Sequence, residues 1–249
     1  MIQLSILKIN GYGPWNLTLG SDREHELQML QASLYKEIQR LFSENNCLVF
    51  LNRSDEFFVV SNGLGLGEHV KIQKILEKSF DIRLSVSIGY GDSPFAANLK
   101  AYDGKKNEVI LSKEHNIFGY LTKSPLSVSI MHLDVDDLTS QRKTNSPYEI
   151  SSIIFSLYSK MSKYFIEKNS LTFYMGGDNF MVVASEEGKN SVKEFIESIK
   201  NEDQIILNCG IGNAKIAREA VKLATKSLDM IREIRDLGKE KPDVYELSC

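Results

Sequence analysis

The sequence predicts an α+β protein in which a β-α-β-β-α-β unit occurs twice in tandem. Three features recur in the same order in each half of the chain: an alternating strand, two apolar runs around a turn that contains an aspartate, and a β-branched run that ends in Gly-x-Gly. The matched positions Asn10 and Asp134, Asp55 and Asp178, and Gly91 and Gly212 lie about 120 residues apart, and a nearly constant separation indicates duplication. Two unrelated α+β domains are the alternative, and they would have to share hairpin position and strand order by accident. In a β-α-β-β-α-β unit, a four-stranded antiparallel sheet carries both helices on one face, which is the ferredoxin-like arrangement.

The first half begins with the strand Ile2–Asn10, in which apolar and polar residues alternate. Apolar residues at spacings of three and four predict a helix over Arg23–Phe42. Two apolar runs around a short polar turn predict a β-hairpin at Cys47–Ser61. The elements expected after the hairpin are a helix at Gly67–Lys78, the strand Asp81–Gly91, a further helix and an added strand at Val109–Ser112.

The second half repeats this order and ends in the same way. We therefore expect an N-terminal domain at residues 1–113, a linker at 114–124 and a C-terminal domain at 125–249. The elements expected in the second half are the strand Leu126–Asp134, a helix at Pro147–Lys168, the hairpin Leu171–Ser185, a helix at Lys189–Lys200, the strand Gln204–Gly212, a further helix and an added strand at Val244–Leu247.

Composition argues against several classes of partner. The net charge is -3 and charges of both signs are interspersed, so the basic surplus typical of nucleic-acid binding is missing. The N-terminus has no basic region ahead of its apolar run, and no apolar stretch is long enough for a membrane span. Three widely spaced cysteines fit reduced thiols. We expect a soluble, cytoplasmic protein.

The second half carries the residues best suited to a metal site. Asp134 ends its first strand and Asp178 lies in its hairpin turn, and these strands are neighbours at the centre of a ferredoxin-like sheet. Two adjacent carboxylates repel unless a cation lies between them, and Mg²⁺ uses one or two carboxylates with carbonyl and phosphate oxygens. The Val135 carbonyl is a further candidate ligand, and Gly176 and Gly177 would let the backbone approach phosphate. Each aspartate alone could equally cap a turn.

Several short motifs together resemble archaeal GTP cyclohydrolase III, within the palm-domain superfamily of nucleotidyl cyclases and polymerases. The resemblance extends over essentially the whole chain, including two tandem palm-type domains. The motifs that carry it are Gly-Gly-Asp-Asn-Phe-Met at 176–181, Tyr-Gly-Pro-Trp at 12–15, Arg53 with Asp55, and His-Leu-Asp at 132–134.

The resemblance implies an enzyme that opens the guanine imidazole ring of GTP and releases two phosphates. The product would be a formylaminopyrimidine ribosylamine monophosphate. Two Mg²⁺ ions would be held by Asp134, Val135 and Asp178 of the second palm, and the sequence leaves open whether a monovalent cation takes part. Sheets with apolar edges also favour a homo-oligomer.

Further residues are candidates for catalysis or substrate binding. His132 lies on the same strand face as Asp134, so it could move protons or merely accept a hydrogen bond. Asn179 and the helix residue Arg232 could contact the nucleotide, although Arg232 could equally belong to a solvated helix face.

The first half departs from the family pattern. Asn10 and Gly11 stand where the family's first strand ends in Asp-Asn, and Ser54 and Glu56 flank the aspartate of the hairpin. We therefore expect the first palm to recognise the base or a second subunit rather than a metal. Its candidate substrate-binding residues, each with a purely structural alternative, are Asn10, Arg53, Asp55 and Trp15, which we expect in a loop beside the strand end.

Two other functions compete with the cyclohydrolase. A palm-type nucleotidyl cyclase would use the same metal pair to form a phosphodiester. Cyclases that make cyclic dinucleotides continue Gly-Gly-Asp with Glu-Phe, whereas Asn179 stands here. A non-catalytic nucleotide sensor is the second alternative, and the departures in the first palm favour it.

Overall fold

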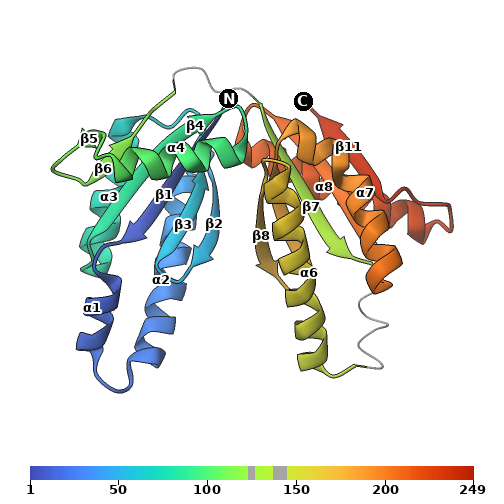
Figure 1. Ribbon diagram of the computed structural model, residues 1–249, viewed down its shortest axis with the longest axis horizontal. Coiled ribbons are helices and arrows are strands. Elements are labelled where there is room, and N and C mark those ends of the chain that lie inside the picture. Colours follow the sequence, from blue (N-terminus) through green and yellow to red (C-terminus); the bar gives the residue numbers. More distant parts are fainter. Residues whose placement is uncertain (123–126, 137–144) are drawn as a thin grey trace. The chain divides into compact units, whose positions relative to one another are not determined.

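The computed structural model describes residues 1–122, 127–136 and 145–249 (Figure 1). The chain divides into two compact units. Unit 1 comprises Met1–Asp92 with Ala96–Leu126, and unit 2 comprises Ser93–Phe95 with Ser127–Cys249. None of the helices in these described stretches has the length and apolar composition of a membrane span.

Unit 1 contains a six-stranded sheet in the order β2-β3-β1-β4-β6-β5. The central strand β1 pairs antiparallel with both β3 and β4, as the ferredoxin-like prediction requires. The elements are β1 (Ile2–Ile9), α1 (Tyr12–Asn16), the 3₁₀ helix η1 (Leu17–Leu19), α2 (Arg23–Ser43), β2 (Leu48–Arg53), β3 (Glu56–Val60), α3 (Leu66–Phe80), β4 (Leu84–Gly91), α4 (Pro94–Lys106), β5 (Ile110–Ser112) and β6 (Ile117–Gly119).

Unit 2 contains a five-stranded sheet in the order β11-β10-β7-β9-β8. Its central strand β7 pairs antiparallel with β9 and β10, and β11 adds parallel to β10. The α+β prediction of two β-α-β-β-α-β units is confirmed. The elements are β7 (Val128–Val135), α6 (Pro147–Glu167), β8 (Leu171–Gly176), β9 (Asn179–Ala184), α7 (Glu186–Asp203), β10 (Leu207–Ala214), α8 (Ala217–Asp236) and β11 (Val244–Ser248).

The hydrophobic core of each unit lies between one sheet face and two helices. In unit 2, alternate residues Leu133 and Val135 of β7 pack with buried residues of α6 and α7. The same alternation places Leu7 and Ile9 of β1 against α2 and α3 in unit 1. Intervening residues of β1 and β7 therefore point to the opposite face.

A third helix covers that opposite face in each unit, and it lies close to glycines of the sheet. A Cβ on Gly212 would collide with the backbone of Ala220 and Ala224 in α8, and a Cβ on Gly89 would collide with Ala97 and Ala101 in α4. The repeated glycine–alanine contact shows that α4 and α8 occupy equivalent positions in the two units.

The strand pairing corrects the alignment of the two halves. Leu7 pairs with Phe57 and Ile9 with Leu84, whereas Leu133 pairs with Phe180 and Val135 with Leu207. The residue of unit 1 equivalent to Asp134 is therefore Lys8, and Asn10 is equivalent to Asp136. The expected match of Asn10 with Asp134 was wrong by two residues.

Two local expectations in unit 1 also differ from the structure. The segment expected as a linker at 114–124 contributes β6, because buried Ile117 completes the core beside β4; residues 123–124 lie outside the described part. The strand parallel to β4 is thus β6, while β5 lies at the sheet edge. Trp15, expected in a loop, lies in helix α1.

Candidate active site in the second unit

Asp134 lies near the end of β7 on the sheet face covered by α8. Its side chain is buried, and its Oδ2 accepts a hydrogen bond from Arg232 Nη2 at 2.6 Å. The same guanidinium donates from Nη1 to Asp229 Oδ1, one turn back along α8, at 3.0 Å. Arg232 is therefore held between two carboxylates beside the strand end, with 40% of its side chain still exposed.

The second oxygen of this carboxylate has no partner. Asp134 Oδ1 is buried and, among the described residues, makes no hydrogen bond. A buried carboxylate oxygen without a donor is costly unless a cation or donor from a ligand satisfies it. Across the described stretches, no group of three or more His, Cys, Asp and Glu side chains is arranged for a metal.

A chain of hydrogen bonds connects α8 to the hairpin turn. His132 Nε2 lies 3.0 Å from Asn179 Oδ1, and Asn179 Nδ2 donates to Asp178 Oδ1 at 3.1 Å. Because the amide oxygen of Asn179 can only accept, His132 carries its proton on Nε2. Its Nδ1 then accepts from the hydroxyl of Thr225, 3.2 Å away.

Its surroundings also favour the neutral form of His132. Burial lowers the pKa of His132 below its usual value, against the opposing effects of the Asn179 hydrogen bond and the Asp134 charge. A neutral imidazole with a fixed tautomer orients Asn179, and through it the half-buried Asp178.

The hairpin turn needs its two glycines. Gly176 has φ 102° and Gly177 has φ 62°, both in the left-handed region that disfavours a side chain. The hydroxyl of Tyr174 donates to the Gly177 carbonyl at 3.2 Å. Tyr174 also packs against Phe155 and Phe180, with ring centroids 5.8 and 5.7 Å away, so aromatic contacts hold the turn in place.

A pocket of about 430 Å³ adjoins this turn on the side of α6. The capping box of Ser146 and Glu149 begins α6 here; Ser146 Oγ accepts from the Glu149 N–H, and the Ser146 carbonyl accepts from the Ile150 N–H. The pocket combines apolar and polar walls; it is lined by Asn145, Pro147, Ile150, Ser151, Ile154, Tyr174 and Gly177.

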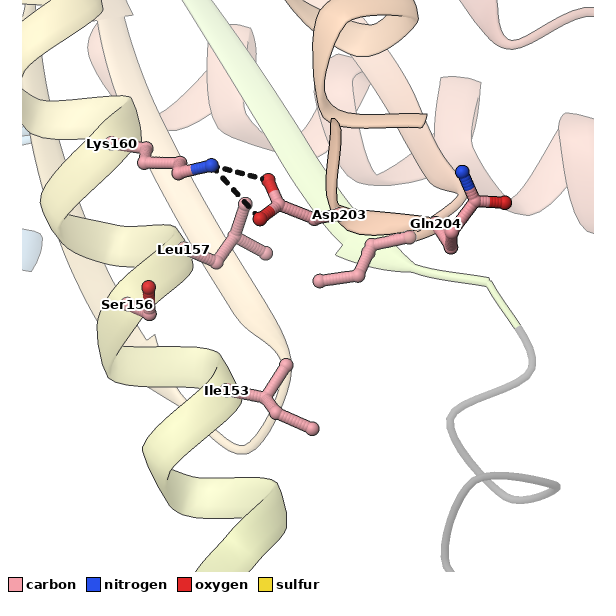
Figure 2. Close-up of a pocket in the computed structure, with 7 residues that line it drawn as sticks. Ile153, Ser156, Leu157, Lys160, Asp203 and Gln204 are labelled. Atoms are coloured by element: carbon pink, nitrogen blue, oxygen red, sulfur yellow. Dashed lines mark hydrogen bonds and ion pairs between the residues drawn. The ribbon is translucent and has the colours of Figure 1, made fainter. Parts of the chain in front are cut away.

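A different pocket, shown in Figure 2, shares no lining residue with this site. It has a volume of about 300 Å³ and lies between α6 and the end of α7. Lys160 reaches into it and donates to both carboxylate oxygens of Asp203, at 2.8 and 2.7 Å. Because Lys160 and Asp203 already neutralise each other, we assign no function to this pocket.

Asp136 is a charged residue of the strand end that sequence reasoning missed. Its carboxylate accepts from Arg235 Nη1 at 2.8 Å and pairs with Lys241 Nζ at 3.1 Å. Burial works against its charge, but hydrogen bonds from Lys241 and Arg235 prevail and hold the pKa of Asp136 below its usual value. The sequence signal that could have identified Asp136 is its spacing of two residues from Asp134, because this spacing places both carboxylates on one strand face.

The candidate residues of unit 1 form a separate group. Arg53 lies 3.2 Å from Glu56 and 4.0 Å from Asp55, and Asp55 lies 3.9 Å from Lys8. Asn10 is exposed at the end of β1. Trp15 is half-buried, with its ring 6.0 Å from Tyr12.

Comparison with known proteins gives a match along almost the whole chain. A family model described as GTP cyclohydrolase III matches residues 2–244. The GTP cyclohydrolase III of Methanothermobacter thermautotrophicus is 32% identical over 239 residues, which cover 93% of this chain and 95% of that protein. The protein of the same name from Methanocaldococcus jannaschii is 29% identical over 248 residues, covering 93% and 88%.

Solved structures give more distant similarities. A bacterial light-regulated adenylyl cyclase has a TM-score of 0.40 at 11% identity, covering 94% of this chain and 83% of that chain. The GGEEF domain of a diguanylate cyclase from Vibrio cholerae has a TM-score of 0.34 at 13% identity, covering 49% and 82%.

Proposed function

The chain belongs to the GTP cyclohydrolase III family of enzymes, and from this premise we propose that unit 2 carries the active site and uses magnesium. One water adds across the C8–N9 bond of guanine, which leaves a formylamino group on one nitrogen and an amine on the other. Two further waters hydrolyse two phosphoanhydride bonds. The products are a formylaminopyrimidine ribosylamine monophosphate and two phosphates.

The observation that carries this proposal is the unpartnered, buried Oδ1 of Asp134 beside the Gly-Gly-Asp-Asn turn. Asp134, Asp178 and the carbonyl of Val135 are the groups that would hold magnesium. The bound ions would neutralise the triphosphate and lower the pKa of coordinated water. Arg232 fixes Asp134 Oδ2 at 2.6 Å, so Oδ1 keeps one direction for its ligand.

The neighbouring side chains set the position of Asp178. His132 donates to Asn179 and Asn179 donates to Asp178, so rotation of any one of these groups disturbs the next. His132 is neutral, and its Nε2 proton is the one closest to the turn. We propose that His132 orients Asn179 and Asp178 through these hydrogen bonds. His132 can transfer a proton to the substrate only if Asn179 moves away from its Nε2.

The pocket beside the turn suits a purine nucleotide. Ile150, Ile154 and Tyr174 provide an apolar wall, and Ser151 offers a hydroxyl for a base edge. Positive φ at Gly176 and Gly177 lets phosphate oxygens approach the backbone closely. The start of α6 adds a partial positive charge at the same end.

Three finer features also belong to the proposal. We expect a homo-oligomer, supported by the exposed apolar residues Tyr148 and Phe155 of α6, and light scattering would measure it. The free cysteines Cys47 and Cys209 fit a reducing compartment such as the cytoplasm. A monovalent cation could assist GTP binding, which turnover in K⁺ and in its absence would test.

The direct test is GTP turnover in the Asp178→Asn variant. We expect loss of the guanine spectral change and of phosphate release, because the amide cannot hold magnesium. The matched control is Asp55→Asn, the equivalent turn residue of unit 1, which should retain turnover. Full activity of Asp178→Asn, or equal loss in both variants, contradicts the assignment to unit 2. Release of pyrophosphate with an unchanged guanine spectrum would indicate a cyclase.

A further inference from the structure

Unit 1 has its own pocket at the position where unit 2 has the candidate active site. This pocket, which we call the Lys8 pocket, has a volume of about 580 Å³ and lies on the face of the sheet covered by α4. The function proposed for unit 2 uses none of its residues, although Arg53 is one of the substrate-binding candidates named from the sequence. Its lining residues are Ile6, Lys8, Arg53, Glu56, Phe58, Ser87, Asn98, Leu99, Tyr102, Lys105 and Lys106.

Strand register and helix contacts establish the equivalence. Lys8 occupies the β1 position that Asp134 occupies in β7. The glycine contacts align Ala101 of α4 with Ala224 of α8, so Lys106 is equivalent to Asp229. Two carboxylates of the second unit are thus replaced by two ammonium groups in the first.

The charge of the pocket is correspondingly reversed. Four cationic side chains line it, with Glu56 as its one acidic lining residue. Glu56 is already bonded to Arg53, at 3.2 Å, and to the Asn52 amide, at 2.7 Å. Glu56 therefore offsets only part of the positive charge of the pocket, and Asp55, 3.9 Å from Lys8, offsets a further part.

Among the lining residues, Lys105 gives the strongest indication that the pocket binds an anion. Its Nζ donates to Ser85 Oγ at 2.6 Å, and within the described ranges no carboxylate lies within 4.0 Å of it. Burial and then the neighbouring charge of Lys8 lower the pKa of Lys105, against the opposing effect of the Glu56 charge. A half-buried ammonium that faces a second ammonium is stabilised when an anion lies between them.

We propose that the Lys8 pocket binds the phosphate chain of a nucleoside phosphate and does so without a divalent metal. Lysine and arginine side chains are the usual ligands of phosphate. The exposed ring of Tyr102 and the side chain of Leu99 form an apolar rim on which a base can stack. The volume is in the range of small-molecule sites, and the acidic net charge of the chain disfavours a long nucleic acid.

The test is calorimetric binding of a non-hydrolysable GTP analogue and of inorganic tripolyphosphate in excess EDTA. We expect both to bind the full-length protein, the nucleotide more tightly, with affinity that falls as salt rises. Lys8→Gln and Lys105→Gln should each weaken binding about tenfold, the effect of losing one charge-assisted hydrogen bond. Neither variant removes a packing contact of the core, and circular dichroism would verify the fold.

Two further variants separate this pocket from the active site. Lys36→Gln, at an exposed lysine of α2, should bind as the unmodified protein does, and Asp178→Asn should keep the metal-free binding after losing turnover. The proposal is overturned if neither probe binds in EDTA, or if both lysine variants bind unchanged. If the protein turns over GTP but neither probe binds in EDTA, the Lys8 pocket proposal is wrong and the assignment of the active site to unit 2 is unaffected.

Discussion

At the scale of single residues, the hydrogen-bonded chain from Thr225 through His132 and Asn179 to Asp178 is the feature most open to test. Thr225→Val removes the donor to His132 Nδ1 while keeping the shape of the side chain. We expect kcat for GTP to fall several-fold with little change in KM, since one neutral hydrogen bond contributes about 1 kcal/mol. Thr225→Ser should restore kcat because it keeps the hydroxyl.

Steady-state kinetics of these two variants would measure the effect. Lys226→Gln is the matched control, because Lys226 is the next residue of α8 and is exposed. An equal loss in the serine variant would mean that packing, rather than the hydroxyl, matters at this position.

A buried histidine of unit 1 makes stability depend on pH. His69 Nδ1 donates to the Gly65 carbonyl at 2.7 Å, so its Nε2 accepts from Ser5 Oγ, also at 2.7 Å. Burial lowers the pKa of His69, against the effects of the Gly65 hydrogen bond and the charge of Glu68. Below the unfolded pKa of about 6.5, the unfolded chain binds the proton more readily than the folded chain, so stability falls on acidification.

We therefore expect Tm to decrease as pH falls below about 6.5, and less steeply in His69→Gln. Thermal unfolding followed by circular dichroism from neutral to mildly acidic pH would compare the slopes. His25→Gln is the control, because His25 is exposed and should leave the slope unchanged. Parallel slopes in all three proteins would assign the acid sensitivity to other groups.

At the same scale, the sequence shows the turn motif but not the partners that its neighbouring residues bond to. The glycines and aspartate of the turn, and Asp134, were visible as a motif. Asp136 was missed because Arg235 and Lys241, which bond to it, lie about 100 residues further along the chain. The match of Asn10 with Asp134 went wrong because a two-residue shift keeps every side chain on the same strand face, so alternation cannot reveal it.

At the scale of elements, the contact between β10 and α8 determines where the helix can lie. Gly212→Ala would place a methyl group against the backbone of Ala220 and Ala224, which cannot rotate away. We expect a loss of about 1–3 kcal/mol of unfolding free energy, as for other overpacked sites, together with reduced turnover, because α8 also carries Arg232. Chemical denaturation and GTP assays would measure both.

Gly238→Ala serves as the comparison for this variant. Gly238 has open space around it but a positive φ, so its substitution adds backbone strain without displacing α8. A Gly212→Ala protein with unchanged turnover would show that the site tolerates movement of the helix.

Hairpins and long helices were predictable from local pattern, because alternation and helical spacing are properties of each segment alone. The strand β6 was not, because three residues are too few for a periodic signal and its pairing with β4 depends on distant residues. The role of α8 in covering the site was equally invisible, since nothing local shows which sheet face an added helix will cover.

At the scale of the whole molecule, each unit has its own core, and structural damage should stay within one unit. Phe57 and Phe180 are equivalent, fully buried residues of the two cores. Phe180→Leu should leave a cavity and increase amide hydrogen exchange in β7–β10, while β1–β4 keep their protection. Phe57→Leu should give the converse pattern.

Hydrogen exchange with mass spectrometry would measure both variants under one set of conditions. Faster exchange in both units from either substitution would show that the two cores unfold as one cooperative structure. Such coupling would make activity in unit 2 sensitive to changes in unit 1.

The different lengths of α4 and α8 have a consequence for how one architecture came to hold opposite charges. Helix α4 ends at Lys106, whose counterpart in α8 is Asp229, whereas α8 continues through Arg232 to Asp236. This extension of about two turns brings the Arg232 guanidinium to the strand end, where it bonds to Asp134. Unit 1 lacks the extension, and Lys8 stands at the position of Asp134. In these two copies of one architecture, the length of a single helix thus goes together with the sign of the charge that the neighbouring strand end can hold.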